Sequence, residues 1–281
     1  MHRLIWSVGS KGVLREMDGR MSGDTCQEIV QKIDKSQIPV CRIMKVDVAA
    51  INMEWLIRFT RENIKDLGGN YCCVANVHTT VTAWEDGKYR EIQNESALTI
   101  PDGGPLSSIG RKRGHVNMGR TAGPDYMEEV FKMSAEEGYR HFFYGSTQET
   151  LDKLKEKIEK KYPGIEIVGM YSPPFQPLSE EEDKRIINRI NKSDADFIWV
   201  GLGAPKQERW MACHKGCVKG FMVGVGAGFD YFAGNIKRAP MWIQKSNLEW
   251  LYRLMQEPRR LFMRYIKTNT KFIWHAYIRG E

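Results

Sequence analysis

The residue types best suited to chemistry stand in a glycine-rich segment, Gly201-Leu-Gly-Ala-Pro-Lys-Gln-Glu208. Its glycines let a ligand approach the backbone, and a helix expected to open at Ala204-Pro205 presents free N–H groups and the positive end of its dipole. Gly203, Lys206 and Gln207 are therefore predicted to hold a diphosphate. The alternative is that glycine and proline only shape a tight turn here.

A second glycine-rich segment, Gly224-Val-Gly-Ala-Gly-Phe-Asp230, matches part of a dinucleotide fingerprint. It lacks the final spaced glycine and follows a late strand, whereas the fingerprint belongs to the first strand of its unit. No nicotinamide cofactor is expected.

Asp102 follows a strand-like Leu98-Thr-Ile-Pro and precedes two glycines, so its carboxylate could project into a cleft as a general base. Asp-Gly is also a common turn dipeptide, and spacing alone does not decide between the two. Asp125 is expected to be a helix N-cap, and His78 a hydrogen-bonded side chain near a strand end.

Strand-like and helix-like segments alternate along the chain, and several strands are apolar on both faces. This pattern predicts an α/β fold, a Rossmann-like parallel sheet flanked by helices, whose ligands bind beyond the carboxyl ends of the strands. Strands are expected at residues 43–48, 71–76, 98–101, 141–144, 165–170, 197–203 and 220–226, and helices at 52–64, 148–162, 179–191 and from 204.

Composition places further limits on the 281-residue chain, which is 42% hydrophobic and 27% charged. No run of about 18 apolar residues is present and the N-terminus lacks the apolar core of a secretory signal, so a cytoplasmic location is expected. The six cysteines have no disulfide-framework spacing, and Cys213-His-x-x-Cys217 lacks a second pair of ligands. No structural metal is expected.

The positive charge is confined to the C-terminal tail. From Lys237 onward there are ten basic and three acidic residues, which equals the net charge of +7 of the whole chain. Two helices are expected here, one opened by a capping box from Ser246 to Glu249 and one by Glu257-Pro258. The second carries a basic stripe, Arg260, Arg264, Lys267 and Lys271, beside an apolar side, Leu261, Phe262, Tyr265, Ile266, Phe272, Ile273 and Tyr277.

A basic and apolar helix of this kind is typical of one that lies in an anionic headgroup layer. The alternative is a core-packed helix with a basic solvent face. Binding of single-stranded nucleic acid by interleaved aromatic and basic residues is a weaker interpretation, and no nucleic-acid partner is expected.

Across about residues 42 to 267 the chain resembles the WecG/TagA/CpsF family, glycosyltransferase family 26. The resemblance rests on ordered blocks: Leu98-Thr-Ile-Pro-Asp-Gly, Arg120 with Gly123-Pro-Asp125, Phe142-Phe-Tyr-Gly-Ser, Ser172-Pro-Pro-Phe, Trp199-Val-Gly-Leu-Gly-Ala-Pro-Lys-Gln-Glu, Gly224-Val-Gly-Ala-Gly-Phe-Asp, Ala233-Gly-Asn-Ile-Lys-Arg-Ala-Pro and Leu248-Glu-Trp-Leu-Tyr-Arg-Leu-Met-Gln-Glu-Pro-Arg-Arg.

The resemblance implies an inverting transfer of a hexose or N-acetylhexosamine from a UDP-sugar to an undecaprenyl-diphosphate-linked sugar, without metal or cofactor, in cell-surface polysaccharide or teichoic acid synthesis. A catalytic α/β domain is expected over residues 1–235, within which residues 1–40 form a poorly defined N-terminal extension. The resemblance also implies a membrane-associating appendage over 236–281, on the inner face of the plasma membrane. Homo-oligomerisation is left open.

The resemblance also assigns roles to residues. It implies a catalytic aspartate at Asp102, and its donor-binding residues fall on Gln207 and Asp230. Its basic site residues fall on Arg120, Arg253 and Arg260. Asn76 matches the family's Thr-x-Asn, but Val74 replaces the threonine, which puts the identity of the sugars in doubt.

Two other classes of function compete with this interpretation. A non-catalytic adaptor that binds nucleotide-sugars at the membrane surface would account for the tail but not for the glycine segments. A nucleotide-sugar oxidoreductase would require the nicotinamide fingerprint that the chain lacks.

Overall fold

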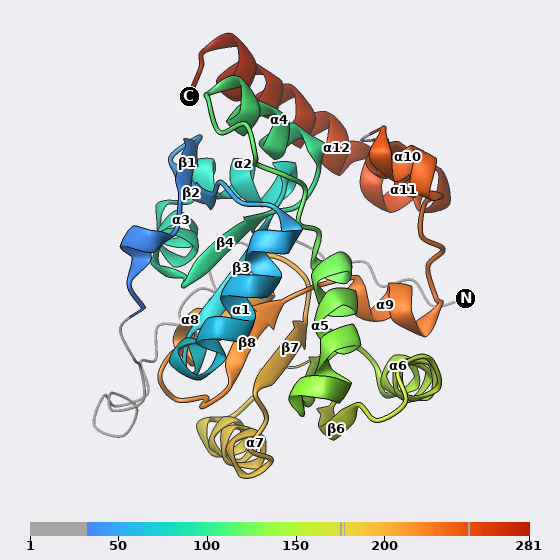
Figure 1. The fold of residues 1–281 in the computed structure, drawn as a ribbon. Coiled ribbons are helices and arrows are strands. Elements are labelled where there is room, and N and C mark those ends of the chain that lie inside the picture. Colours follow the sequence, from blue (N-terminus) through green and yellow to red (C-terminus); the bar gives the residue numbers. More distant parts are fainter. Residues whose placement is uncertain (1–32, 175, 177, 247) are drawn as a thin grey trace.

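The fold is built around a six-stranded sheet, whose order is β4-β3-β8-β7-β5-β6 and whose neighbours are all parallel (Figure 1). The computed structural model describes residues 33–281 except 175, 177 and 247. The strands are β3 (Tyr71–Ala75), β4 (Leu98–Pro101), β5 (Arg140–Gly145), β6 (Glu166–Tyr171), β7 (Phe197–Gly201) and β8 (Phe221–Gly224). The predicted α/β fold is confirmed.

Helices cover both faces of the sheet. Alternate strand residues explain this, because Phe197, Trp199 and Val223 belong to one apolar cluster while Ile198 and Met222 belong to another. The first cluster contains residues of α1 (Met53–Leu67), α5 (Gly123–Glu137), α6 (Gln148–Lys161) and α9 (Gly228–Ala233), and the second contains residues of α7 (Glu180–Lys192) and α8 (Lys206–Cys213).

A third apolar cluster lies beside the β4 edge of the sheet. It joins the antiparallel strands β1 (Val40–Ile43) and β2 (Val46–Ala49) to α2 (Val77–Glu85), α3 (Gly87–Glu95), α4 (Gly104–Lys112) and the C-terminal segment. Phe272 and Ala276 of that segment are buried in it, so the tail is part of the packed structure.

The ends of several helices follow from their capping residues. Ser179 and Glu182 form the predicted capping box at the start of α7, and Thr147 and Asn52 cap α6 and α1 through their side chains.

The single strand predicted over residues 43–48 is wrong. The segment is a hairpin whose turn residues Met44 and Lys45 have φ of 48° and 67°. Neither Met nor Lys favours a positive φ, so no turn residue marks the hairpin in the sequence, and the alternating pattern predicts one continuous strand. Tertiary contacts hold it, because the Met44 side chain is fully buried and Lys45 Nζ lies 4.4 Å from the centre of the Trp84 ring.

The C-terminal helices also differ from the prediction. They are α10 (Met241–Lys245), α11 (Glu249–Gln256) and α12 (Pro258–Phe272), followed by a π-helix at Ile273–Ile278. The capping box from Ser246 to Glu249 is absent: Leu248 is the N-cap of α11, the Ser246 hydroxyl donates to Trp242 O, and Glu249 forms ion pairs elsewhere.

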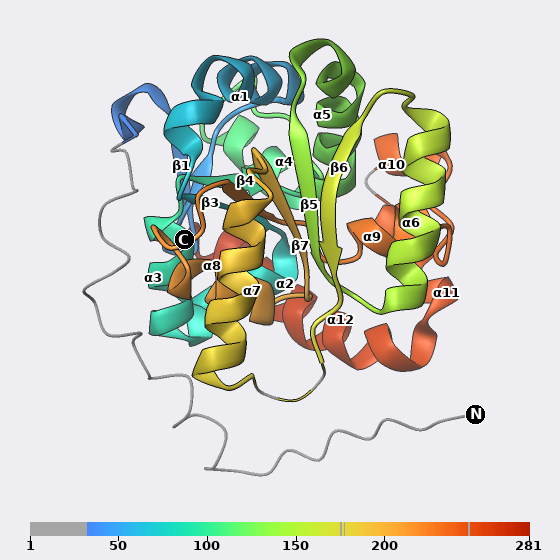
Figure 2. The ribbon, with the colours of Figure 1, turned by 90° about the horizontal axis from the view of Figure 1, so that it is seen from below.

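Helix α12 packs on α2 and crosses the carboxyl end of the sheet (Figures 1 and 2). Leu261 faces inward and is buried. None of the helices in the described ranges combines the length and apolar character needed to cross a bilayer.

Gly145 is predicted to be the glycine of the sheet that least tolerates a side chain. Its φ is 122°, and an added Cβ would lie 2.7 Å from the carbonyl carbon and oxygen of Gly201 on the neighbouring strand. We expect Gly145→Ala to lower the free energy of unfolding by about 2 to 4 kcal/mol in urea denaturation. Gly138→Ala is the control, because Gly138 has φ of 69° but open space around it, and should cost about 1 kcal/mol. If Gly145→Ala and Gly138→Ala lower the free energy of unfolding equally, the contact between the added Cβ and Gly201 does not contribute to the loss of stability.

Candidate active site

A cavity of about 720 Å³ lies beyond the carboxyl ends of β3, β4, β7 and β8, and residues of α11 and α12 line its other side. The carboxyl ends of the strands are where open parallel sheets bind their ligands. The residues proposed from the sequence that line it are Asn76, Asp102, Arg120, Gly203, Gln207, Asp230 and Arg253. Lys206 is exposed and is not among the lining residues, and the side chain of Arg260 is outside the described part of the chain.

Asp102 is placed by the end of β4. Its backbone N–H donates to Ala75 O at 2.7 Å, and Gly103 follows with φ of 100° before α4 begins. Burial raises the pKa of the Asp102 carboxyl to about 6, although the nearby guanidinium of Arg120 lowers it. A carboxylate with a pKa near neutrality that lines a cavity has the properties of a general base.

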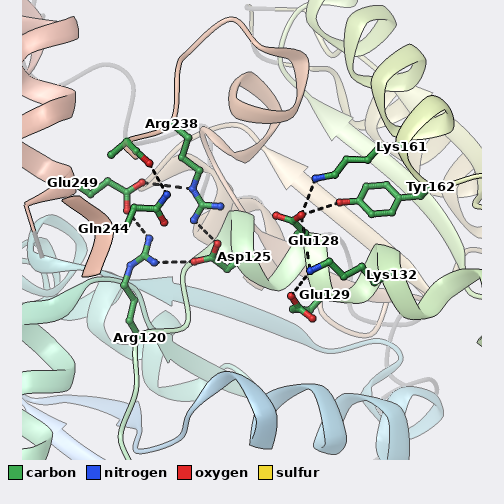
Figure 3. Close-up of polar contacts among 11 residues, drawn as sticks. Arg120, Asp125, Glu128, Glu129, Lys132, Lys161, Tyr162, Arg238, Gln244 and Glu249 are labelled. Atoms are coloured by element: carbon green, nitrogen blue, oxygen red, sulfur yellow. Dashed lines mark hydrogen bonds and ion pairs between the residues drawn. The ribbon is translucent and has the colours of Figure 1, made fainter. Parts of the chain in front are cut away.

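Four charged side chains form a network next to Asp102 (Figure 3). Arg120 Nη1 lies 2.9 Å from Asp125 Oδ2, and Arg120 Nη2 lies 2.5 Å from Glu249 Oε2. Arg238 pairs with Asp125 and lies 3.8 Å from Glu249 Oε1. The network thus joins the start of α5 to the start of α11, and fixes the Arg120 guanidinium at the cavity.

Asp125 therefore does not act as the predicted N-cap. The N-cap of α5 is Ala122, and Asp125 lies in the first turn, where its carboxylate is engaged by two arginines. A separate group in Figure 3, centred on Glu128, joins α5 to Lys161 of α6 and does not line the cavity.

Arg253 of α11 contributes a second cation to the cavity. Its guanidinium lies 5.6 Å from the centre of the Tyr231 ring, and its Nε is buried without a hydrogen-bond partner among the described residues. The nearest carboxylate oxygen, Glu257 Oε2, is 3.8 Å from Nη2. A guanidinium with unused donors is suited to bind a phosphate.

Gln207 lies between the two glycine segments. Its Oε1 accepts hydrogen bonds from the backbone N–H groups of Gly203 at 3.1 Å and Gly226 at 3.0 Å, and its Nε2 donates to Glu208 Oε1 at 2.8 Å. The amide is thus used inside the protein, and a direct contact with a diphosphate would require some of these bonds to break.

Two further predicted residues have structural partners as well as a place at the cavity. The Asn76 side chain caps α2 by accepting from Thr79 N–H, in a capping box that the sequence reading missed. Asp230 lies in the first turn of α9 and its Oδ1 accepts from Asn235 Nδ2 at 3.1 Å.

Several lining residues were not singled out from the sequence for this site. His78 was expected to be hydrogen-bonded, but its Nδ1 is buried without a partner in the described ranges, and burial lowers its pKa to about 4. Glu249 was interpreted as a capping residue and Arg264 as part of a lipid-facing stripe, yet both line the cavity. The others from the tail are Gln244, Trp250, Leu261, Tyr265, Thr268, Asn269, Phe272, Ile273 and Tyr277.

In the Cys213-His-x-x-Cys217 segment, Cys213 is an exposed free thiol, whereas Cys217 is buried and disulfide-bonded. His214 is buried, with Nδ1 at 2.7 Å from Trp210 O and Nε2 at 2.8 Å from Asp183 Oδ2. Within the described residues no group of three His, Cys, Asp or Glu side chains is arranged to hold a metal ion.

Comparison with known proteins gives the family. A model described as "Glycosyl transferase WecG/TagA/CpsF family" matches residues 41–280. A protein of Bacillus subtilis (strain 168), named N-acetylglucosaminyldiphosphoundecaprenol N-acetyl-beta-D-mannosaminyltransferase, is 30% identical over 194 residues, which are 68% of this chain and 73% of that protein. A protein of the same name from Bacillus spizizenii (strain ATCC 23059 / NRRL B-14472 / W23) is 29% identical over 193 residues, with the same coverage. The chain therefore belongs to the WecG/TagA/CpsF family of glycosyltransferases.

Proposed function

We propose that this glycosyltransferase moves an N-acetylhexosamine-type or hexose sugar from a UDP-sugar to a sugar linked to undecaprenyl diphosphate, in the synthesis of a cell-surface polysaccharide or teichoic acid. The observation that carries the proposal is a carboxylate of raised pKa, Asp102, beside two cations, Arg120 and Arg253, in one cavity. The names of the two relatives support a lipid-diphosphate acceptor and make N-acetylmannosamine the first donor sugar to test.

In this proposal Asp102 removes the proton from the acceptor hydroxyl, whose oxygen attacks the anomeric carbon of the donor. The bond from that carbon to the phosphate oxygen breaks, UDP leaves, and the single displacement inverts the configuration. Arg253 and Arg120 stabilise the negative charge that develops on the leaving diphosphate. A retaining route would need a second carboxylate as nucleophile, but Asp125 and Glu249 are both held in ion pairs, and this proposal places Asp230 beside the nucleotide.

We place the nucleotide against the two glycine segments, residues 201–203 and 224–228. Both line the cavity with Asp230, and they present backbone rather than bulky side chains. The acceptor would then enter on the side of α2 and α12, whose residues also line the cavity.

We further propose that residues 236–281 form an appendage that associates peripherally with the inner face of the plasma membrane. The large exposed apolar side chains of this segment are Met241, Trp242, Leu248, Trp250, Leu251, Met255, Phe262, Met263, Ile266, Ile273, Trp274, Tyr277 and Ile278. Arg264 lines the cavity and Lys271 pairs with Glu85, so fewer cations remain for lipid than the sequence predicted. Insertion of apolar side chains is therefore the larger contribution.

This membrane contact can be separated from the chemistry. Changing Phe262, Met263 and Ile266 together to serine is expected to weaken co-sedimentation with anionic liposomes about tenfold or more, because each apolar side chain contributes on the order of 1.5 kcal/mol when buried. Transfer to a water-soluble acceptor should stay within about threefold, because none of the three lines the cavity. Val116→Ser is the control, since Val116 is 73% exposed and lies outside the tail. Unchanged sedimentation of the triple variant would contradict the membrane role of α12.

The donor and acceptor are tested by incubating the purified protein with a panel of UDP-sugars and a short-chain lipid-diphosphate N-acetylglucosamine. The proposal expects one UDP-N-acetylhexosamine to give an acceptor-dependent disaccharide-lipid, detected by mass spectrometry. UDP binding in calorimetry with no product from any donor would instead support a non-catalytic adaptor.

A further inference from the structure

The orientation of the Gln207 amide is fixed from both ends. Two backbone N–H donors, from Gly203 and Gly226, point at the same atom, which must therefore be the oxygen. The amide NH₂ consequently points the other way, into the protein, where it donates to Glu208 Oε1. The Gln207 side chain thus bridges the segment after β7 and the segment after β8.

Glu208 is a buried acid that bonds the Gln207 amide and lies near the Tyr89 hydroxyl. It is 1% exposed, burial raises its pKa, and its Oε2 has no hydrogen-bond partner in the described ranges. A polar group in such a place costs stability unless it gains hydrogen bonds. Whether protonated or ionised, its Oε1 can accept from the Gln207 NH₂, so this contact does not depend on the charge of Glu208.

Loss of that acceptor would leave only the two glycine N–H groups to fix the orientation of the Gln207 amide. The Gln207 NH₂ would then be buried and unpaired, and rotating the amide by 180° would place its donors against the two glycine N–H groups. The first result weakens the bridge between the glycine segments and the second breaks it. The two segments together line one end of the cavity.

We propose that Glu208 is a positioning residue that holds the Gln207 amide in the orientation that joins the two glycine segments, and so sets the shape of the nucleotide end of the cavity. The inference rests on the proposed function for the identity of the nucleotide, but the bridge itself is independent of it. Glu208 touches neither substrate in this account and acts only through Gln207.

Two variants separate the acceptor role from simple burial. Glu208→Leu keeps the volume but removes the acceptor, whereas Glu208→Gln retains an oxygen that can accept from Gln207 Nε2. We expect Glu208→Leu to increase hydrogen–deuterium exchange of peptides covering residues 201–207 and 224–228 about fivefold in the free protein, and to weaken UDP binding in calorimetry about tenfold. Glu208→Gln should remain within about twofold of wild type in both measurements.

Thr60→Val is the matched control for loss of a buried polar group. Thr60 is fully buried, its hydroxyl bonds Leu56 O at 2.7 Å and Tyr126 Oη at 2.8 Å, and it is not among the residues that line the cavity. Thr60→Val should lower the free energy of unfolding without changing the hydrogen–deuterium exchange of the glycine segments or the affinity for UDP. The same comparison should show a rise in the donor KM of Glu208→Leu with kcat at saturating donor nearly unchanged, a division that general destabilisation would not produce.

If hydrogen–deuterium exchange of the two glycine segments in Glu208→Leu equals that of wild type, Glu208 does not support the bridge. If exchange increases but UDP affinity is unchanged, the bridge does not shape the nucleotide end of the cavity. Equal losses in Glu208→Gln and Glu208→Leu would also overturn the inference, because the carboxyl charge would then matter and not the orientation of the amide. A wild-type protein that does not bind UDP would refute the proposed donor, while the exchange measurement would still decide the bridge.

Discussion

Asp102→Asn is expected to lower transfer about a hundredfold or more, the usual contribution of a positioned general base, while UDP affinity stays within about twofold. Asparagine has nearly the same shape and fits beside Arg120, but its amide cannot accept the proton of the acceptor hydroxyl. Steady-state kinetics with a soluble acceptor and calorimetry with UDP provide the two measurements. Turnover within a few-fold of wild type would remove Asp102 from the mechanism.

The pH profile gives a second test of the same carboxylate. Burial raises the pKa of Asp102 to about 6, so the carboxyl is protonated and inactive as a base below that pH, and becomes active as the pH rises through it. We expect kcat/KM of the wild type to rise tenfold per pH unit well below pH 6 and to level off above it. The residual kcat/KM of Asp102→Asn should not show this rise between low pH and pH 6.

The second large effect is expected at Arg253. Arg253→Ala should lower transfer about a hundredfold and weaken UDP binding, because it removes a cation from the place where the leaving diphosphate gains charge. Arg253→Lys should recover only part of the loss, since an ammonium group does not reproduce the paired donors of a guanidinium.

Arg259→Ala is the control for this experiment. Arg259 belongs to the same tail and carries the same charge, but it is exposed and does not line the cavity. It should keep soluble-acceptor activity within about twofold. Equal losses at Arg253 and Arg259 would show that the general charge of the tail, and not one positioned guanidinium, supports the reaction.

The sheet could be predicted from the sequence because its signals are local. Phe197 to Gly201 reads as a buried strand without reference to any distant residue, and Ser179 with Glu182 marks the start of α7 by itself. The hairpin at Met44-Lys45 could not be found this way. Its turn is held by burial of Met44 and by Trp84, which is far along the chain.

The site was predictable only in part for the same physical reason. Asp102, Gln207 and Arg253 stand in recognisable motifs, and the structure brings them to one cavity. That Glu249 pairs with Arg120 depends on where the fold places the start of α11, and that Arg264 lines the cavity depends on how α12 packs on α2. An amphipathic pattern shows that a helix has an apolar side, but not which partner covers it.

The product of a single reaction tests the central claim most directly. The purified protein is incubated with UDP-N-acetylmannosamine and a short-chain lipid-diphosphate N-acetylglucosamine, and the new glycosidic linkage is examined by NMR, with Asp102→Asn treated in parallel. The account predicts an acceptor-dependent disaccharide-lipid whose new linkage has the anomeric configuration opposite to that of the donor, and nearly none from the variant in the same time. A product of retained configuration, or equal product from Asp102→Asn, would contradict it.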